Sequence, residues 1–167
     1  FIRVTWPSHS LTQIIERISA RQHKVKRICI SQVTHRRSVR DTKDICARLR
    51  SSFDIPVSLL ISPTILTKAD LLDFKDAGAD KIGVAMDLAT PELFDKYRGK
   101  GVGGPHNWKT YRQCLSDAID IFGKRNAGSH FVTGMGETEK EMVEAIQKIQ
   151  DSGGWTHLFS FFPEADS

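Results

Sequence analysis

Two hydrophobic periods alternate along this chain, and their alternation predicts helices and strands in turn. Apolar residues recur every three or four positions in segments that predict amphipathic helices: residues 11–18, 38–49, 67–77 and 108–122, with others starting near 90 and 138. Short apolar runs between them predict buried strands: residues 27–31, 56–61, 81–86, 129–132 and 156–162. Strands that alternate with helices form parallel sheets with right-handed crossovers, so the predicted fold class is α/β.

The length of the chain limits the architecture. A complete eight-stranded (β/α) barrel needs about 250 residues, and this chain has 167. It therefore predicts either a partial barrel of the TIM type or an open parallel sheet. No low-complexity segment or boundary divides the sequence, so residues 1–167 are interpreted as a single domain.

Polar capping residues mark the ends of several predicted helices. A Ser or Thr side chain satisfies a free backbone N–H at a helix start, and glycine closes a helix in the left-handed conformation. The predicted caps are Ser10, Ser38, Thr90 and Thr138 at helix starts and Gly78 at a helix end.

Composition and charge exclude several classes of protein. No apolar run approaches the roughly 18 residues that span a membrane, and no signal peptide is visible, so a cytoplasmic location is expected. The three cysteines, Cys29, Cys46 and Cys114, are widely spaced and odd in number, which argues against a disulfide framework. Basic residues gather at 21–27 and 35–40 without interleaved aromatic residues. They are interpreted as solvated surface, and no nucleic-acid partner is expected.

Polar and small residues follow the predicted strands, where ligands bind in parallel α/β folds. Asp87 can accept hydrogen bonds from the two hydroxyls of a ribose, or it can cap the next helix, which Thr90 already serves. Residues 134–137, Gly-Met-Gly-Glu, form a turn that a planar or anionic ligand can approach closely. The same turn residues can serve turn geometry alone. Further strand ends carry Ser31, Gln32 and Ser62, and the segment from Ser160 to Glu164.

Other candidate residues have ordinary interpretations. His106 and Trp108 stand in the glycine-rich loop that begins at Gly99, and they can form a lid or a substrate wall, or simply pack. His130 lies inside a predicted strand and is interpreted as a core residue. Cys29 is interpreted as a small buried apolar residue. No catalytic residue is assigned, because no nucleophile–base arrangement or carboxylate pair stands out.

Two segments resemble the radical S-adenosylmethionine (SAM) superfamily. They are GADKIGVAMDLATPELF at residues 78–94 and, at a distance, GMGET at residues 134–138. The nearest branch is similar to biotin synthase, and the similarity extends from the helix near residue 11 to the strand at residues 159–162. Such proteins bind SAM and a 4Fe-4S cluster, and reductive cleavage of SAM produces a 5′-deoxyadenosyl radical.

The resemblance implies cofactor contacts at particular strand ends. Asp87 matches the position that holds the ribose of SAM. The turn of Gly134, Gly136 and Glu137 matches the position against which the adenine packs. Flanking candidates are Ser31 and Gln32, towards the methionine moiety, and Ser160 and Phe162, towards the adenine or the substrate.

The resemblance also implies what lies outside this chain. The cluster of the superfamily is held by a C-x3-C-x2-C loop after the first barrel strand, and no such spacing occurs here. The cluster cysteines are therefore expected upstream of Phe1, with no metal ligands within this chain. The chain is expected to correspond to about strands 2–6 of a six-stranded partial barrel, incomplete at both ends and inactive alone. The implied partners are a small-molecule substrate and an electron donor such as a flavodoxin or ferredoxin.

Biotin synthase also holds a sulfur-donating 2Fe-2S cluster with cysteines inside its barrel. Cys29 matches one of those positions, whereas the others fall on Ser58 and on Gly128 or a close neighbour. Since one thiolate cannot hold such a cluster, sulfur-insertion chemistry is not expected, and the substrate stays unassigned.

Two alternatives remain open at this point. One is an ordinary (β/α) barrel enzyme that binds a phosphorylated or carboxylated small molecule through His35, Arg36 and Arg37. The other is a non-catalytic relative of radical SAM enzymes that has lost the cluster.

Overall fold

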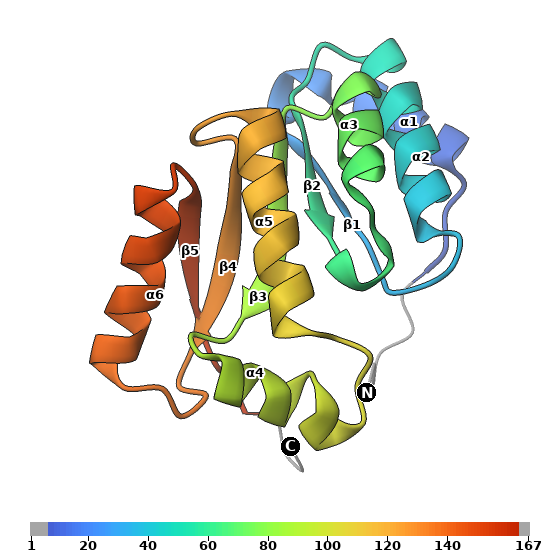
Figure 1. Cartoon of the computed structure of the whole chain (residues 1–167). Helices are drawn as coiled ribbons and strands as arrows, with labels where there is room; N and C mark the ends of the chain where they lie inside the picture. Colours follow the sequence, from blue (N-terminus) through green and yellow to red (C-terminus); the bar gives the residue numbers. More distant parts are fainter. Residues whose placement is uncertain (1–6, 164–167) are drawn as a thin grey trace.

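A computed structural model describes residues 7–163 as five parallel strands backed by helices (Figure 1). The strands pair in the order in which they occur along the chain: β1 (Ile28–Ser31), β2 (Val57–Ile61), β3 (Lys81–Asp87), β4 (Ala127–Thr133) and β5 (Trp155–Ser160). Doubly wound sheets reverse their strand order at a switch point, and this sheet does not. The sequential order confirms the α/β class and the partial barrel, one of the two architectures that the sequence allowed.

The helices lie on one side of the sheet, as barrel crossovers require (Figure 1). They are α1 (Leu11–Ser19), α2 (Ser38–Ser52), α3 (Lys68–Asp76), α4 (Pro91–Tyr97), α5 (Trp108–Phe122) and α6 (Glu139–Asp151). Single 3-10 turns occupy Gln22–Lys24, Pro63–Ile65 and Lys100–Val102. The short α4 lies near the carboxyl ends of the strands, at the bottom of Figure 1.

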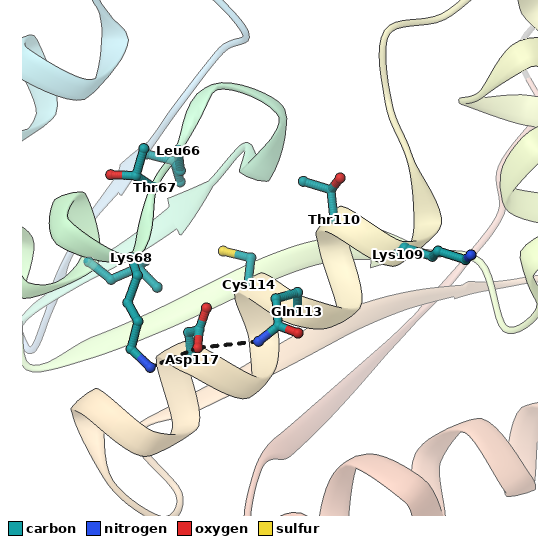
Figure 2. A pocket seen from close by; sticks show the side chains of 9 residues that line it. Leu66, Thr67, Lys68, Lys109, Thr110, Gln113, Cys114 and Asp117 are labelled. Carbon is teal, nitrogen blue, oxygen red and sulfur yellow. Dashed lines mark hydrogen bonds and ion pairs between the residues drawn. The ribbon is translucent and has the colours of Figure 1, made fainter.

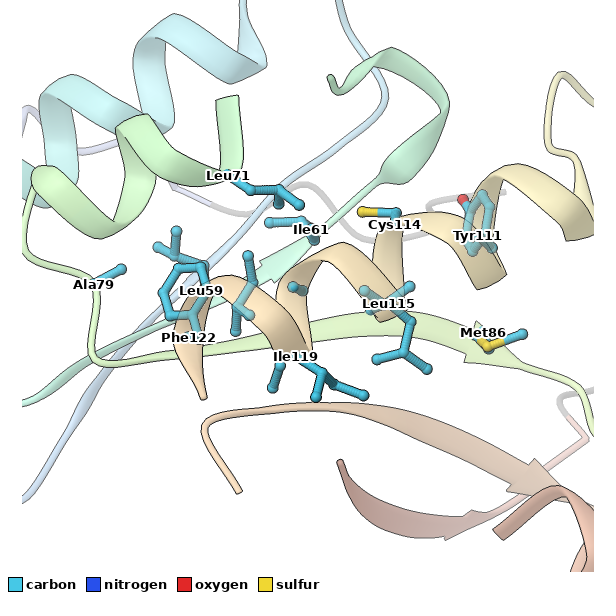
Figure 3. Close-up of a cluster of buried hydrophobic side chains, with 14 of the residues drawn as sticks. Leu59, Ile61, Leu71, Ala79, Met86, Tyr111, Cys114, Leu115, Ile119 and Phe122 are labelled. Atoms are coloured by element: carbon cyan, nitrogen blue, oxygen red, sulfur yellow. The ribbon is translucent and has the colours of Figure 1, made fainter. Parts of the chain in front are cut away.

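The hydrophobic core fills the space between the sheet and the helices (Figure 3). In β2, Val57, Leu59 and Ile61 are buried against this layer, whereas Ser58 and Leu60 on the other face are half-buried. The period of two along the strand therefore separates a core face from an inner, barrel-lining face. α5 contributes the broadest packing face to the core, including the fully buried Tyr111.

Most predicted helix ends are confirmed. The Ser10, Thr90 and Thr138 side chains accept hydrogen bonds from the first turns of their helices, and Gly78 ends α3 with φ of 97°. The predicted Ser38 cap is wrong. Arg37 occupies the cap position, and the Ser38 hydroxyl instead donates to the Val33 carbonyl oxygen at 2.6 Å.

The three cysteines occupy two different environments. Cys46 and Cys114 are buried among the helices, and burial raises the pKa of these thiols to about 11 and about 12. Cys29 was expected to be buried but is exposed, because it lies on the inner face of β1, which no helix within residues 7–163 covers. Among residues 7–163, no cluster of three His, Cys, Asp or Glu side chains is arranged to hold a metal ion. No helix in the same range is long and apolar enough to cross a membrane.

Candidate functional site

A pocket of about 380 Å³ lies at the carboxyl ends of β3 and β4, where the sequence predicts ligand binding. Its walls come from three segments that are far apart in the chain: Asp87, Leu88, Tyr97, Arg98, Val132, Met135 and Phe161. The fold thus brings Asp87 beside the turn that follows β4. These are the two regions from which the sequence analysis predicted a cofactor site.

An irregularity at the end of β3 sets the conformation of Asp87. The register between β3 and β4 shifts between Val84 and Asp87, and Asp87 adopts φ of 63°. Aspartate and asparagine tolerate this left-handed region better than most residues, at a cost of order 1 kcal/mol. Because Thr90 caps α4, the Asp87 carboxylate is not needed for that helix.

Arg98 holds one side of the Asp87 carboxylate. Its Nη1 donates to Asp87 Oδ2 at 2.5 Å and also to the Ala85 carbonyl oxygen. Among the residues that the structure describes, Asp87 Oδ1 has no hydrogen-bond donor, so it is available to a ligand. Burial raises the pKa of Asp87 above its ordinary value, and the Arg98 guanidinium opposes that rise.

The ion pair continues into a chain of hydrogen bonds. Arg98 Nη2 donates to the Tyr111 hydroxyl at 3.3 Å, and that hydroxyl lies 2.9 Å from His106 Nδ1. Thr64 Oγ1, in the turn after β2, lies 2.6 Å from the same nitrogen. Burial and the Arg98 charge lower the pKa of His106, which favours a neutral imidazole. His106 therefore anchors the glycine-rich loop to the site, and Trp108 packs edge-on against Phe94.

The turn after β4 is closed by Glu137. Its Oε1 accepts a hydrogen bond from the Gly134 N–H at 2.7 Å, and its Oε2 accepts one from the Met135 N–H at 3.0 Å. Gly134 and Gly136 adopt φ of 93° and 109°, so glycine is required for the backbone conformation. A Cβ atom at Gly134 would meet only Phe161 Cβ, at 3.7 Å. These contacts favour turn geometry as the role of Glu137, which the sequence left open beside ligand contact.

Replacement of Glu137 by alanine separates these two roles. The loss of two hydrogen bonds to backbone N–H groups is expected to lower the free energy of unfolding by about 1–2 kcal/mol. Urea denaturation of Glu137→Ala measures this, with Glu139→Ala, an exposed glutamate of the same helix start, as the control. A Glu137→Ala protein of unchanged stability that binds SAM tenfold more weakly would instead show direct ligand contact.

The other predicted site residues lie outside this pocket. Ser31 is exposed at the end of β1. The Gln32 side chain accepts from the Ser62 N–H at 3.2 Å and donates to the Ser38 carbonyl oxygen at 3.3 Å, so it ties the loops after β1 and β2 together. His35, Arg36 and Arg37 are exposed in the loop before α2 and do not line the pocket.

The end of β5 contributes Phe161, which the sequence prediction included in the segment from Ser160 to Glu164 but did not single out. Phe161 lines the pocket, whereas Phe162 is 82% exposed and Ser160 is also exposed. Trp155, His157 and Phe159 lie on the inner face because they pair with Gly128, His130 and Val132. Continuing this alternation by one step would have selected Phe161. Glu164 lies outside the described residues.

The inner face of the sheet, beneath the pocket, shows whether the chain could hold the sulfur-donating 2Fe-2S cluster of biotin synthase. Cys29 lies beside Ser58 in register, and Gly128 pairs with Trp155. A Cβ atom at Gly128 would overlap the Trp155 carbonyl oxygen and indole ring, and one at Gly83 would lie 3.2 Å from the far edge of the indole. The indole therefore covers the position where a further cysteine of the biotin synthase pattern would stand.

A larger hollow, of about 460 Å³, lies between α3 and α5 on the helix layer (Figure 2). Asp117, the acidic residue that lines this hollow, already forms an ion pair with Lys68 at 3.0 Å and accepts a hydrogen bond from the Gln113 amide at 3.3 Å. It contains none of the strand-end residues, so we do not assign the site there.

Comparison with known proteins identifies the family. The sequence model of the radical SAM superfamily matches residues 2–149. The chain belongs to the radical SAM superfamily. No curated protein matches the sequence significantly. Membership of the radical SAM superfamily implies SAM and a 4Fe-4S cluster as cofactors, and the described residues provide no ligand set for the cluster.

Two solved structures share the radical SAM fold of this chain. Methylornithine synthase (PylB) superposes with a TM-score of 0.78 at 12% identity, over 96% of this chain and 47% of that chain. HydG, a maturase of the FeFe hydrogenase, superposes with a TM-score of 0.76 at 10% identity, over 98% of this chain and 39% of that chain. The chain thus spans less than half the length of either.

Proposed function

We propose that this chain is the SAM-binding part of a radical enzyme that acts on a small molecule. The observation that carries the proposal is the convergence of Asp87 and the turn after β4 on one pocket at the carboxyl ends of the strands. Family membership supports it, because the chemistry that bound SAM supplies is a carbon radical that removes a hydrogen atom from a substrate. The same proposal includes a one-electron donor, such as a flavodoxin or ferredoxin. It also includes a cytoplasmic location.

The residues of the pocket fit a nucleoside. Asp87 Oδ1 accepts hydrogen bonds from the ribose hydroxyls, while Arg98 holds the carboxylate in place through Oδ2. Met135, Val132 and Phe161 supply apolar walls for a flat base. The glycine turn brings backbone rather than side chains to this edge. Ser31, Gln32, Gly136, Glu137, Ser160 and Phe162 remain candidate cofactor contacts within this proposal.

The chain does not fit the sulfur-donating chemistry of biotin synthase. Cys29 is the single thiol on the inner face of the described sheet, and Ser58 and Gly128 stand where the resemblance expects thiolates. We therefore propose a radical enzyme without an auxiliary sulfur cluster on these positions.

Binding and turnover of SAM by the full-length protein test the proposal. After anaerobic reconstitution with iron and sulfide, we expect SAM to bind and, with dithionite, to yield methionine and 5′-deoxyadenosine. A protein that binds SAM but takes up no iron would support the non-catalytic alternative. A protein that binds sugar phosphates but not SAM would support the ordinary barrel enzyme.

The pH dependence of SAM binding reports the charge of Asp87. Binding needs the ionised carboxylate, so affinity should fall as the pH drops through the pKa of Asp87, which burial raises and Arg98 opposes. In Arg98→Met the opposing charge is removed, and the midpoint of this loss should move to higher pH. Calorimetric titrations across the acidic range measure both midpoints, with Arg36→Met as the control. A midpoint that moves to lower pH in Arg98→Met would contradict the role of Arg98.

A further inference from the structure

Another pocket, of about 280 Å³, opens on the inner face of the sheet, and we call it the lumen pocket. Its polar wall residues come from all of the strands and the residue before β1: Arg27, Cys29, Ser58, Lys81, His130 and His157. Two of these side chains, Arg27 and Lys81, are basic, and no carboxylate lines the pocket. The wall thus combines two basic side chains with further hydrogen-bonding groups.

The two cations of the lumen pocket lack the carboxylate partner that several other cations of the chain have. Lys43, Lys68 and Arg98 each contact an aspartate at 3.0 Å or less. Within residues 7–163, neither Arg27 nor Lys81 forms an ion pair. Lys81 lies beside Ser58 in register, and Arg27 directly precedes β1. The Arg27 and Lys81 side chains are therefore both available to bind an anion.

Aromatic rings form another part of the wall. The His130 imidazole lies 5.3 Å from the Trp155 ring, 5.8 Å from the His157 ring and 5.3 Å from the Phe159 ring, measured between centroids. His157 and Phe159 stack at 4.6 Å with an interplanar angle of 11°. Flat rings at this spacing favour a flat or apolar body over a strongly hydrated one.

The lumen pocket lies close to the pocket that contains Asp87 at the carboxyl ends of β3 and β4, which we call the nucleoside pocket. His130 in the lumen pocket and Val132 in the nucleoside pocket are both on the inner face of β4. Two residues of a strand span roughly 7 Å, so a molecule in the lumen pocket would lie directly beneath a nucleoside held by Asp87. This is where a substrate of the proposed reaction has to be.

We propose that the lumen pocket binds a small organic carboxylate, with its carboxylate towards Arg27 and Lys81 and its body against the ring wall of His130 and Trp155. As an assignment of substrate class, this inference rests on the proposed function. A carboxylate is favoured over a phosphate because phosphate sites commonly use helix N-termini. The helix N-termini of this fold lie at the opposite, carboxyl edge of the sheet.

Cys29 provides a direct readout of occupancy. Its thiol lines the lumen pocket and is exposed, whereas Cys46 and Cys114 are buried. In the full-length protein, the rate at which iodoacetamide alkylates Cys29 can be followed by mass spectrometry of its peptide. Phenylacetate is the probe, its neutral isostere phenylacetamide tests the charge, and inorganic phosphate tests the alternative anion. Neither SAM nor the cluster is needed.

Phenylacetate is expected to slow alkylation of Cys29 at concentrations at which phenylacetamide and phosphate do not. Lys81→Met should weaken the phenylacetate effect about tenfold, because a charge-assisted hydrogen bond is lost, and Lys81→Arg should restore most of it. Arg36→Met, an exposed cation outside the pocket, should change nothing. If Lys81→Met does not fold, Arg27→Met gives the same test outside a strand.

Equal protection by phenylacetate and phenylacetamide would overturn the proposal, as would an Arg36→Met effect equal to that of Lys81→Met. Protection by phosphate as strong as by phenylacetate would overturn the assignment of a carboxylate. The two proposals fail separately: loss of Cys29 protection with intact SAM binding refutes only the lumen pocket. Absence of SAM binding with intact protection refutes the nucleoside site and the substrate role, and leaves an anion site.

Discussion

Replacement of Asp87 by asparagine is expected to weaken SAM binding by about 10- to 100-fold, since a hydrogen bond to a charged group contributes about 1.5–3 kcal/mol. Asparagine keeps the shape of the side chain and tolerates the φ of 63° at this position. The substitution therefore removes the charge of the carboxylate with little change to the backbone. Calorimetric titration of SAM into the full-length protein measures the loss.

The specificity of this effect can be tested with the ligand itself. Wild-type protein should bind 5′-methylthioadenosine more tightly than its 2′,3′-dideoxy analogue, and Asp87→Asn should remove that difference. Asp76→Asn, an exposed aspartate at the end of α3, is the matched control and should leave both affinities unchanged. If Asp87→Asn still distinguishes the two nucleosides, the ribose hydroxyls are held elsewhere.

Substitution of Gly128 by alanine is expected to cause the largest loss of stability, about 3 kcal/mol or more in the free energy of unfolding. The new methyl group would overlap both the Trp155 backbone carbonyl and its indole ring. A side-chain ring can rotate away, but the carbonyl belongs to a paired strand and cannot move without breaking the ladder between β4 and β5. Urea denaturation monitored by circular dichroism gives the difference.

Gly83→Ala is the matched control for this prediction. Its Cβ would meet only the ends of two side chains, Trp155 Cη2 at 3.2 Å and Leu60 Cδ1 at 3.3 Å. These atoms can shift by a few tenths of an ångström, so the cost should be about 1 kcal/mol or less. Equal stability losses in the two variants would show that the contact with the Trp155 carbonyl is not the cause of the loss in Gly128→Ala.

The sequence predicted best what depends on neighbouring residues or on a general rule of the fold. The caps at Ser10 and Thr138 were predictable because a capping box is complete within four residues. The convergence of Asp87 with the turn after β4 was predictable because parallel strands place their carboxyl ends at one edge of the sheet. Both depend on sequence spacing that can be read without tertiary structure.

What the sequence did not predict depends on tertiary contacts. Arg98 follows Asp87 by 11 residues, beyond an intervening helix, and only the path of α4 returns it to the carboxylate. Cys29 is exposed because it lies on the inner face of β1 rather than on the face that packs against the helices, and the residues around it do not encode which face that is. The choice between Phe161 and Phe162 depends on strand register, where a shift of one residue changes the face.

The hydrogen-bond chain from Asp87 to Thr64 links the carboxyl ends of two neighbouring strands, β3 and β2, through the side chains of Arg98, Tyr111 and His106. The charge of Asp87 raises the pKa of His106, although burial and Arg98 lower it more. A ligand that changes the protonation or hydrogen bonding of Asp87 therefore affects the His106 imidazole in the glycine-rich loop, through Arg98 and Tyr111. Under the proposed function, the His106 imidazole therefore reports whether the ribose of SAM is bound to Asp87.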